Sequence, residues 1–337
     1  MGIPDRGAAD EITLRDNRNA FDRLRLKGRV LTPVSGGHTR LQLFGVGYEH
    51  PVFVAPLAYQ KLFHPDGELA TALGASAMAA CMTVSTLATT PVEEISAVTR
   101  SPWWFQLYFQ PTREATLELV QRAEAAGCQA LVVTVDAPIA GIRNREQRVR
   151  FRLPQGVAAV NLPRIAPQST VEAPGQNAVF DGLMSAAPTW SDIAWLASAT
   201  RLPLLVKGIL DADDALRALD HGAAGIVVSN HGGRIQDTLP ATVDAPPAIA
   251  DAVAGRAPVL LDGGIRRGSD VFKAIALGAS AVMVGRPCMH ALAAAGALGV
   301  AHVLRTLREE LEVVMALNGC ATLQAIDRGS LFVQKAW

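Results

Sequence analysis

One unit, a short apolar run followed by a segment with helical spacing, repeats along the chain and limits its fold most strongly. The runs are rich in β-branched residues and are continuously apolar rather than alternating, which is typical of parallel strands buried on both faces. Eight runs fit this description: 52–55, 82–86, 103–108, 130–136, 203–208, 225–229, 258–262 and 280–285.

Helix-like segments lie between these strands, at 67–79, 91–98, 112–126, 189–200, 211–221, 244–254 and 268–277. Eight strand–helix units close naturally into a barrel, so we predict an α/β fold, a single-domain (β/α)₈ TIM barrel over residues 1–337. A doubly wound open sheet is the competing fold, and it places a nucleotide fingerprint after its first strand. The sequence Ala55-Pro56-Leu57-Ala58-Tyr59 is not such a fingerprint.

Three segments lie outside the repeat. Residues 1–50 form a lead-in whose first twenty residues are polar, and we expect these to contribute nothing to the core. Residues 153–188, rich in Pro, Gly, Ala and Gln, predict a long loop after strand 4. We expect that loop to cover the site as a lid, with a variable insertion as the alternative. Residues 287–318 predict one or two final helices.

The composition limits the classes of binding partner that we expect. The 31 basic and 31 acidic residues leave no charge excess that would favour a nucleic acid or a membrane surface. The four cysteines are far apart and form no Cys-x-x-Cys pair, which indicates buried thiols rather than a metal site or disulfides. The sequence shows no signal peptide, and we expect no apolar span long enough to cross a bilayer. We therefore expect a cytoplasmic protein.

Polar residues gather where the predicted strands end. The carboxyl ends of barrel strands meet on one face, so these side chains should lie close together. They are Ser85, Gln106, Tyr108, Thr134, Asp136, Lys207, His231, Arg234, Asp262 and Arg286. Side chains alternate along a strand, so Gln106 and Tyr108 should point the same way. For any single residue, a hydrogen-bonded polar group in the barrel core is the alternative.

The sequence Ser229-Asn230-His231-Gly232-Gly233-Arg234 places a candidate general base and a fixed cation together at the end of the sixth strand. Taken alone, the stretch also fits a hairpin loop with a surface histidine. Glycine-rich turns follow the next two strands, at 262–268 and 285–287. Backbone N–H groups in such turns, together with arginine, favour an anion, so a phosphorylated cofactor or substrate is expected there.

These motifs together carry a resemblance. The residues are Phe105-Gln106-Leu107-Tyr108, Thr134-Val135-Asp136-Ala137-Pro138, Leu205-Val206-Lys207-Gly208, Ser229 to Arg234, and Asp262 to Gly268. In combination the chain resembles the FMN-dependent α-hydroxy-acid oxidase and dehydrogenase family, which includes glycolate, lactate and mandelate oxidases. The resemblance runs from about Gly7 to Gly319.

The resemblance implies that FMN oxidises a small 2-hydroxy acid to a 2-oxo acid. His231 matches the family's base, and Asp136 matches the carboxylate that pairs with it. Arg143 and Arg234 match the arginines that bind the substrate carboxylate, and Tyr108 matches a residue that hydrogen-bonds the substrate. Arg145 lies close to Arg143 in sequence, but the family's spacing after Thr-Val-Asp-x-Pro selects Arg143.

The resemblance also implies a set of residues that bind FMN, with Lys207 beside the pyrimidine edge of the flavin, and it implies no metal. The matching positions are Pro56, Leu57, Ala58, Ser85, Gln106, Thr134, Lys207, Ser229, Asp262, Gly263, Gly264, Arg266, Gly285 and Arg286. Members of the family are commonly tetramers, so a homotetramer is expected by analogy.

The chain departs from the family pattern at three places. Ile3 stands near the position of a substrate-binding tyrosine, and Ile235-Gln236-Asp237 replaces the usual Gln-Leu-Asp. Leu87 stands where glycolate oxidase has a tryptophan. A missing hydroxyl and a smaller side chain both favour a larger, more apolar substrate. We therefore expect a mandelate-like or medium-chain 2-hydroxy acid rather than glycolate.

Three alternatives remain open at this point. The electron acceptor is O₂, which we favour, or a quinone or other carrier, which would make the enzyme a dehydrogenase. An FMN-dependent isomerase shares the glycine-rich phosphate turns, but it does not need two arginines beside His231. A barrel that has lost its chemistry and only binds a ligand is the third possibility.

Overall fold

Eight parallel strands form a closed barrel in the computed structural model, which describes residues 6–162 and 177–332. Around the barrel the neighbours follow the order β10-β11-β4-β5-β6-β7-β8-β9. The strands are β4 (Val52–Val54), β5 (Met82–Ser85), β6 (Trp103–Leu107), β7 (Leu131–Thr134), β8 (Leu204–Ile209), β9 (Gly225–Val228), β10 (Val259–Asp262) and β11 (Ala281–Val284). The predicted TIM barrel is thus confirmed.

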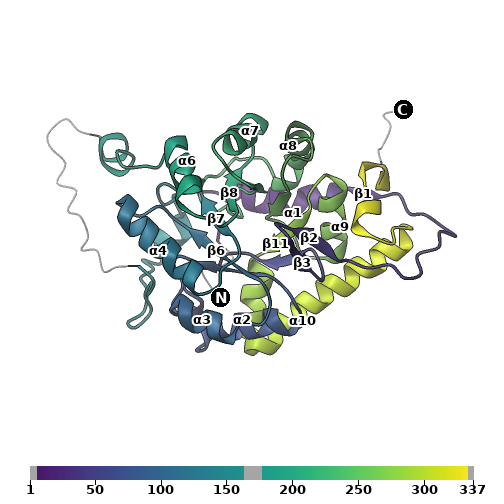
Figure 1. The fold of residues 1–337 in the computed structure, drawn as a ribbon, viewed down its shortest axis with the longest axis horizontal. Helices are drawn as coiled ribbons and strands as arrows, with labels where there is room; N and C mark the ends of the chain where they lie inside the picture. The colour runs from purple at the N-terminus through teal and green to yellow at the C-terminus, as the bar shows by residue number, and fades with distance from the viewer. Residues whose placement is uncertain (1–5, 163–176, 333–337) are drawn as a thin grey trace.

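Helices cover the outside of the barrel (Figure 1). They are α1 (Ile12–Arg23), α2 (Gly67–Ala77), α3 (Val92–Val98), α4 (Arg113–Ala125), α5 (Asn144–Arg148), α6 (Trp190–Ala199), α7 (Ala212–Asp220), α8 (Pro246–Val253), α9 (Gly268–Ala276) and α10 (Arg286–Leu317). The seven helices expected between strands are present, with ends that differ by no more than two residues.

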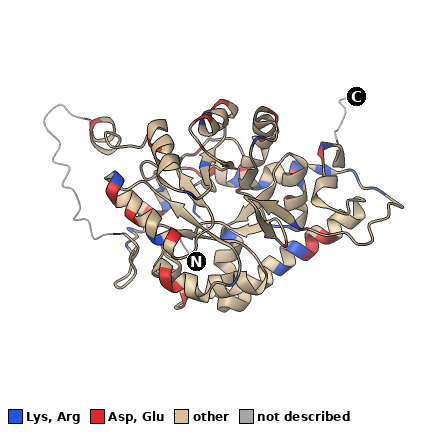
Figure 2. Cartoon of the chain, viewed as in Figure 1, with Lys and Arg blue, Asp and Glu red and all other residues tan. Residues whose placement is uncertain are grey.

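The strands are continuously apolar because both of their faces are buried. One face fills the barrel interior and the other packs under the helices, so Val132, Leu205, Ile226 and Leu260 are fully buried. Many of the charged residues belong to the outer helices (Figure 2). The fully buried large side chains of the described residues therefore belong mostly to the strands and to the helix faces that touch them.

Helix α10 corrects one expectation from the sequence. Its 32 residues are long and apolar enough to cross a membrane by length and composition alone. It packs against α2 and α9, however, and buries one stripe that includes Val300, Leu304, Leu307 and Leu311. The helix also changes direction at Ala295 and Gly296, where the backbone leaves helical geometry.

Two small two-stranded sheets lie outside the barrel. The hairpin of β2 (Leu41–Leu43) and β3 (Val46–Tyr48) lies at the amino-terminal end of the barrel, where Phe44 approaches Gly225 at the start of β9. Tyr48 packs there against Trp104 and accepts a hydrogen bond from its indole nitrogen at 3.1 Å. Strand β1 (Arg25–Leu26) pairs antiparallel with β12 (Leu331–Phe332), which ties together segments from the two ends of the chain.

The expectation that the first twenty residues contribute nothing to the core is wrong. Helix α1 buries Thr13, Asn17 and Ala20. Asn17 and Asn230 exchange two side-chain hydrogen bonds, at 2.8 and 2.9 Å, in a buried position. Thr13 and Asn17 face the loop that follows β9 rather than solvent, so their polarity was a poor guide to their exposure.

The long loop after the fourth barrel strand is present. Between β7 and α6, the described residues contain only the short helix α5 and a π-helical turn, Ala178–Leu183. Residues 163–176 of the predicted lid, 153–188, lie outside the described residues. Within the described part, Leu153 lines the site cavity and Asn161 is anchored to the backbone of Thr90 and Val92.

The contact between Asn17 and Asn230 yields a stability prediction. Replacing Asn17 by alanine removes both hydrogen bonds to Asn230 and leaves the buried N–H group of Thr242 without its acceptor, which costs about 1–3 kcal/mol. We expect Asn17→Ala to lower the free energy of unfolding by that amount in urea titrations. Asn19→Ala, an exposed position on the same helix, is the control and should not destabilise the protein. Equal stability of the two variants would contradict the account.

Candidate active site

A cavity of about 580 Å³ opens at the carboxyl ends of the barrel strands. Ligand pockets commonly measure ~300–1,000 Å³. The sequence-predicted residues that line it are Pro56, Leu57, Ala58, Ser85, Gln106, Tyr108, Thr134, Arg143, Lys207, His231, Arg234, Asp262, Gly263, Gly264, Arg266, Gly285 and Arg286. Asp136 and Ser229 do not line it but contact residues that do. The fold thus brings the predicted site residues together.

His231 lies on the cavity wall with Asp136 behind it. The Nδ1 atom of His231 is 2.9 Å from Oδ1 of Asp136. An ionised carboxylate only accepts hydrogen bonds, so Nδ1 must carry the proton. Nε2 of the neutral imidazole then has a lone pair that can accept a proton. This is the arrangement of a histidine base with its orienting carboxylate.

The backbone of His231 is held in an uncommon conformation. Its φ angle of 57° lies in the left-handed region, which few residues other than glycine adopt. The N–H group of His231 donates to Oγ of Ser229 at 3.0 Å, which fixes the turn after β9. Such strain at a cavity wall is typical of functional sites, where the surrounding structure compensates for it.

Charge keeps Asp136 ionised in spite of its burial. Burial alone would raise the pKa of Asp136, but the hydrogen bond and charge of His231, together with Lys207, outweigh it and lower the pKa. The carboxylate therefore remains available to stabilise a protonated His231.

Lys207 is a buried cation on the cavity wall. Its Nζ atom lies 2.8 Å from Asp262 and donates to Oγ of Ser229 at 2.9 Å. Burial alone would lower the pKa of Lys207, but the negative charges of Asp262 and Asp136 outweigh it and raise the pKa. The lysine thus supplies a fixed positive charge at this side of the cavity.

Two arginines from different loops line the same cavity as His231. Arg143 precedes α5, and Arg234 lies in the loop after β9. Glu146 contacts both: Oε2 is 3.0 Å from Arg143, and Oε1 is 3.1 Å from Arg234. Burial and the charge of Arg143 lower the pKa of Arg234, while Glu146 opposes that shift. A role for Glu146 was not predicted from the sequence.

A close backbone approach brings these two arginine loops together. A Cβ atom added to Gly141 would lie 2.1 Å from the carbonyl oxygen of Ile235, so only glycine fits. Ile235 lines the cavity itself. Asp237, two residues further, accepts hydrogen bonds from the backbone of Asp10 and Thr13 at the start of α1. The unusual sequence after Arg234 therefore serves both the cavity wall and the helix that packs behind it.

Tyr108 completes the polar side of the cavity. Burial raises the pKa of Tyr108 to about 12, so its hydroxyl keeps its proton at neutral pH. The charges of Lys207, Asp136, Arg143 and Arg234 act on this phenol as well, which places it in the same electrostatic environment. A protonated phenol can donate a hydrogen bond to a bound anion.

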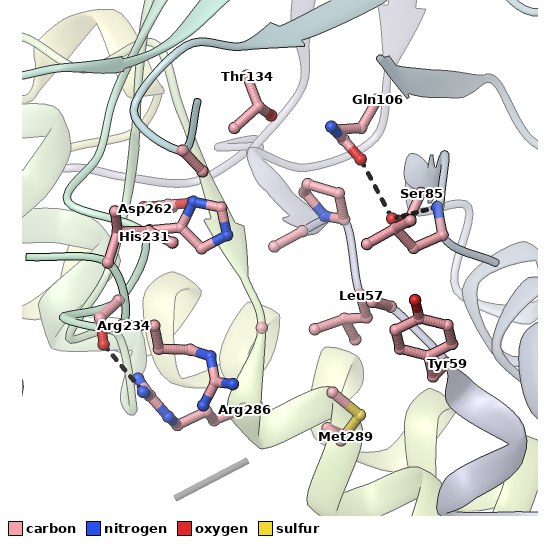
Figure 3. Close-up of a pocket in the computed structure, with 18 of the residues that line it drawn as sticks. Leu57, Tyr59, Ser85, Gln106, Thr134, His231, Arg234, Asp262, Arg286 and Met289 are labelled. Carbon is pink, nitrogen blue, oxygen red and sulfur yellow. Dashed lines mark hydrogen bonds between the residues drawn. The ribbon is translucent and has the colours of Figure 1, made fainter. Parts of the chain in front are cut away.

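Two buried polar atoms at the cavity wall have no partner among the described residues. Gln106 accepts from Oγ of Ser85 at 3.1 Å through its Oε1 atom, which leaves Nε2 as a buried donor without a partner. Oδ1 of Asp262 is a buried acceptor without a partner. Figure 3 shows Gln106 and Asp262 on different sides of the pocket. Buried polar groups are nearly always paired, so these atoms indicate a ligand with both acceptors and donors.

An anion cradle lies beside these atoms. Gly264 has a positive φ of 80°, and a Cβ atom there would lie 2.1 Å from the carbonyl oxygen of Asn17. Arg286, at the start of α10, donates to the carbonyl of Gly232 at 2.8 Å. Arg266 also lines the cavity. A glycine turn, two arginines and the amino terminus of a helix together form a site suited to a phosphate.

The remaining wall is apolar. Figure 3 shows Leu57, Tyr59 and Met289 across the pocket from His231. Leu87 also lines the cavity and lies next to Tyr59, since its carbonyl accepts a hydrogen bond from the N–H group of Tyr59 at 3.0 Å. The sequence did not predict a role for Tyr59, although an aromatic residue in the loop that follows a barrel strand was a usable signal.

The comparisons with known proteins decide the family. A family model described as FMN-dependent dehydrogenase matches residues 3–333. The chain belongs to this family. Its cofactor is therefore FMN, as the sequence predicted.

Similar proteins cover nearly the whole chain. An L-lactate oxidase of Roseobacter sp. is 51% identical over 95% of this chain and 86% of its own length. Glycolate oxidase 3 of Arabidopsis thaliana is 46% identical over 96% of this chain and 88% of its own length. The crystal structure of a mandelate oxidase with (S)-2-phenylpropionate has a TM-score of 0.88 at 43% identity, covering 98% of this chain and 92% of that one. These relatives are all 2-hydroxy-acid oxidases.

The cavity walls fit FMN. The buried donor of Gln106 and the cation of Lys207 suit a flavin ring, which carries carbonyl and nitrogen acceptors. The unpartnered oxygen of Asp262 suits a hydroxyl group, and the cradle at Gly264 and Arg286 suits the phosphate. These residues would hold the cofactor.

The contact between His231 and Asp136 yields a prediction for activity. Asp136→Asn removes the charge that stabilises protonated His231 and presents a donor as well as an acceptor to Nδ1. We expect kcat/KM for a 2-hydroxy acid to fall by about 10²–10⁴. Steady-state kinetics on FMN-loaded protein measures this, with FMN content as the control. A loss below threefold would contradict the assigned contact.

Proposed function

We propose that this member of the family oxidises an (S)-2-hydroxy acid to the 2-oxo acid and passes the electrons to O₂, which gives H₂O₂. One observation carries the proposal. His231, which is paired with Asp136 behind it, lines the same cavity as the two cations, Arg143 and Arg234. A 2-hydroxy acid needs both groups at once, because it presents a carboxylate beside a hydroxyl.

Each polar residue has a distinct role in this proposal. The guanidinium groups of Arg143 and Arg234 bind the substrate carboxylate, since arginine matches carboxylate geometry. Nε2 of His231 accepts the hydroxyl proton, and Asp136 stabilises the charge that His231 then carries. The protonated hydroxyl of Tyr108 donates a hydrogen bond to the bound substrate.

The cofactor supplies the redox chemistry. FMN bound in this cavity would supply the hydride acceptor for the oxidation at the substrate Cα. The protein binds and orients the substrate, and Lys207 holds a fixed positive charge beside the cavity. An isomerase would need neither the two carboxylate-binding arginines nor a base paired with Asp136. The arrangement around His231 therefore favours the oxidation.

The oxygen acceptor is supported by the relatives. The L-lactate, glycolate and mandelate proteins that match this chain are all named oxidases. A quinone-linked dehydrogenase is the alternative, and the rate of re-oxidation in air distinguishes the two.

The small side chain at position 87 of the cavity lining supports a substrate larger than glycolate. Leu87 lines the cavity where glycolate oxidase carries the much larger tryptophan. Ile235 adds a further apolar surface beside Arg234. Since the relatives act by name on lactate, glycolate and mandelate, the proposal is a mandelate-like or medium-chain 2-hydroxy acid, with lactate as the comparison.

The proposed reaction predicts a colour change of the bound flavin. The FMN-loaded protein should be yellow, should lose its colour when an L-2-hydroxy acid is added without oxygen, and should regain it within seconds in air. Absorbance near the flavin band measures all three steps. A protein that keeps its colour with every 2-hydroxy acid tested would contradict the proposed function, while slow re-oxidation in air would favour the dehydrogenase.

The cavity lining at Leu87 also predicts how the rate depends on substrate size. We expect kcat/KM to be higher for mandelate than for lactate, and higher for lactate than for glycolate. Leu87→Trp should reduce kcat/KM for mandelate by about 10–200-fold, the range for small changes in an apolar pocket, and should spare glycolate. Leu87→Ile, which conserves volume, is the control. A wild-type preference for glycolate would contradict the assignment of Leu87.

A further inference from the structure

Glu146 holds a position that the reaction itself does not explain. It lines the cavity and its side chain is 14% exposed. Its two carboxylate oxygens bind different arginines: Oε2 binds Arg143 at 3.0 Å and Oε1 binds Arg234 at 3.1 Å. A carboxylate beside the site for a substrate carboxylate should repel the substrate, so its presence requires a compensating benefit.

We propose that Glu146 is a positioning residue that locks the guanidinium groups of Arg143 and Arg234 in the orientation that binds the substrate carboxylate. The proposal rests on the assignment of these two arginines to that carboxylate.

The two arginines need such a link because they come from separate loops. Arg143 lies before α5 in the segment after β7, and Arg234 lies in the loop after β9. Both side chains are about a quarter exposed, at 25% and 22%, so two like charges lie close together with limited solvent screening. A shared carboxylate offsets that repulsion and fixes two long side chains that would otherwise lose rotamer entropy on binding substrate.

Further contacts support a fixed cation pair. Arg234 also donates to the carbonyl oxygen of Arg6 at 2.7 Å. Gly141 lets the backbone of Ile235 approach closely, which keeps the two loops together. A guanidinium has five N–H donors, and Glu146 occupies one oxygen contact on each, so the link does not use up their capacity.

The balance of charge also fits a substrate with one carboxylate. Arg143 and Arg234 carry two positive charges, and Glu146 leaves a net charge of one at this end of the cavity. One substrate carboxylate neutralises it. Without Glu146 the same place would carry two uncompensated positive charges when empty.

Glu146→Gln separates positioning from simple charge. Glutamine has nearly the same shape, but it has one acceptor oxygen and therefore cannot bind both arginines. If Glu146 acted only as a repelling charge, its removal would tighten the binding of an anion. If it positions the arginines, its removal weakens that binding in spite of the more positive cavity.

Oxalate is the probe, because it offers carboxylates but has no Cα–H bond and so binds without turnover. Isothermal titration calorimetry on the FMN-loaded protein measures its Kd. We expect Glu146→Gln to raise the Kd about tenfold, the loss of one charged hydrogen-bond arrangement. An unchanged or lower Kd in Glu146→Gln would overturn the proposal.

Glu11→Gln is the matched control. Glu11 pairs with Arg145 at 3.2 Å near the same loop, and its side chain is 16% exposed, close to that of Glu146. The variant removes the same charge without touching Arg143 or Arg234. Its Kd for oxalate should stay within twofold of the wild type. A loss as large as that of Glu146→Gln would overturn the proposal, because the effect would then follow net charge.

Glu146→Asp tests the role in a variant that keeps the charge and both oxygens. It should bind oxalate within about threefold of the wild type, and binding as weak as in Glu146→Gln would contradict the proposal. In steady-state kinetics, Glu146→Gln should raise KM about tenfold and change kcat less than threefold, since the carboxylate contact is equal in ground and transition states.

The proposed function and the proposed role of Glu146 can fail independently of each other. If no 2-hydroxy acid is oxidised but Glu146→Gln weakens oxalate binding, the proposed function fails and the role of Glu146 stands. If turnover is normal and Glu146→Gln does not change oxalate binding, the proposed function stands and the proposed role of Glu146 fails.

Discussion

The site depends on the pairing of charges at one end of an apolar barrel. Closing eight parallel strands brings every carboxyl end to the same face, so the polar residues there are crowded and largely withdrawn from water. A buried charge is tolerated only when it is compensated. Asp136 therefore pairs with His231, and Asp262 pairs with Lys207. Glu146 pairs with both Arg143 and Arg234. Each pair also fixes the orientation of a group that the proposed reaction needs, so the requirement of stability and the requirement of chemistry are met by the same contacts.

Packing from outside the barrel holds the loop that carries the base. Helix α1 crosses behind the turn after β9, where Asn17 binds Asn230 and where Asp237 binds the first backbone N–H groups of the helix. The close contact of Asn17 with Gly264 extends this support to the phosphate cradle. One helix near the start of the chain thus supports both the substrate side and the cofactor side of the cavity.

Much of this architecture was predictable from the sequence. The strands were recognisable because burial on both faces makes them continuously apolar, and the site residues followed because parallel strands end on one face. The role of α1 was not predictable, since Asn17 is as polar as an exposed residue and its partner is more than two hundred positions away. Glu146 was missed for a similar reason: it lies on a five-residue helix without periodicity, and only the folded loops place it between two arginines. The role of Asp237 was also not predictable from the sequence. Its carboxylate accepts a hydrogen bond from helix α1, which is distant in the sequence.

The central claim is that one substrate spans the arginine pair and the histidine. A crystal structure of the FMN-loaded protein with a bound 2-oxo acid tests it most directly. The account predicts that the carboxylate contacts Arg143 and Arg234 and that the keto oxygen lies within hydrogen-bond distance of Nε2 of His231. A ligand whose carboxylate binds elsewhere, for example at Arg266 and Arg286, or whose keto oxygen faces away from His231, would contradict it.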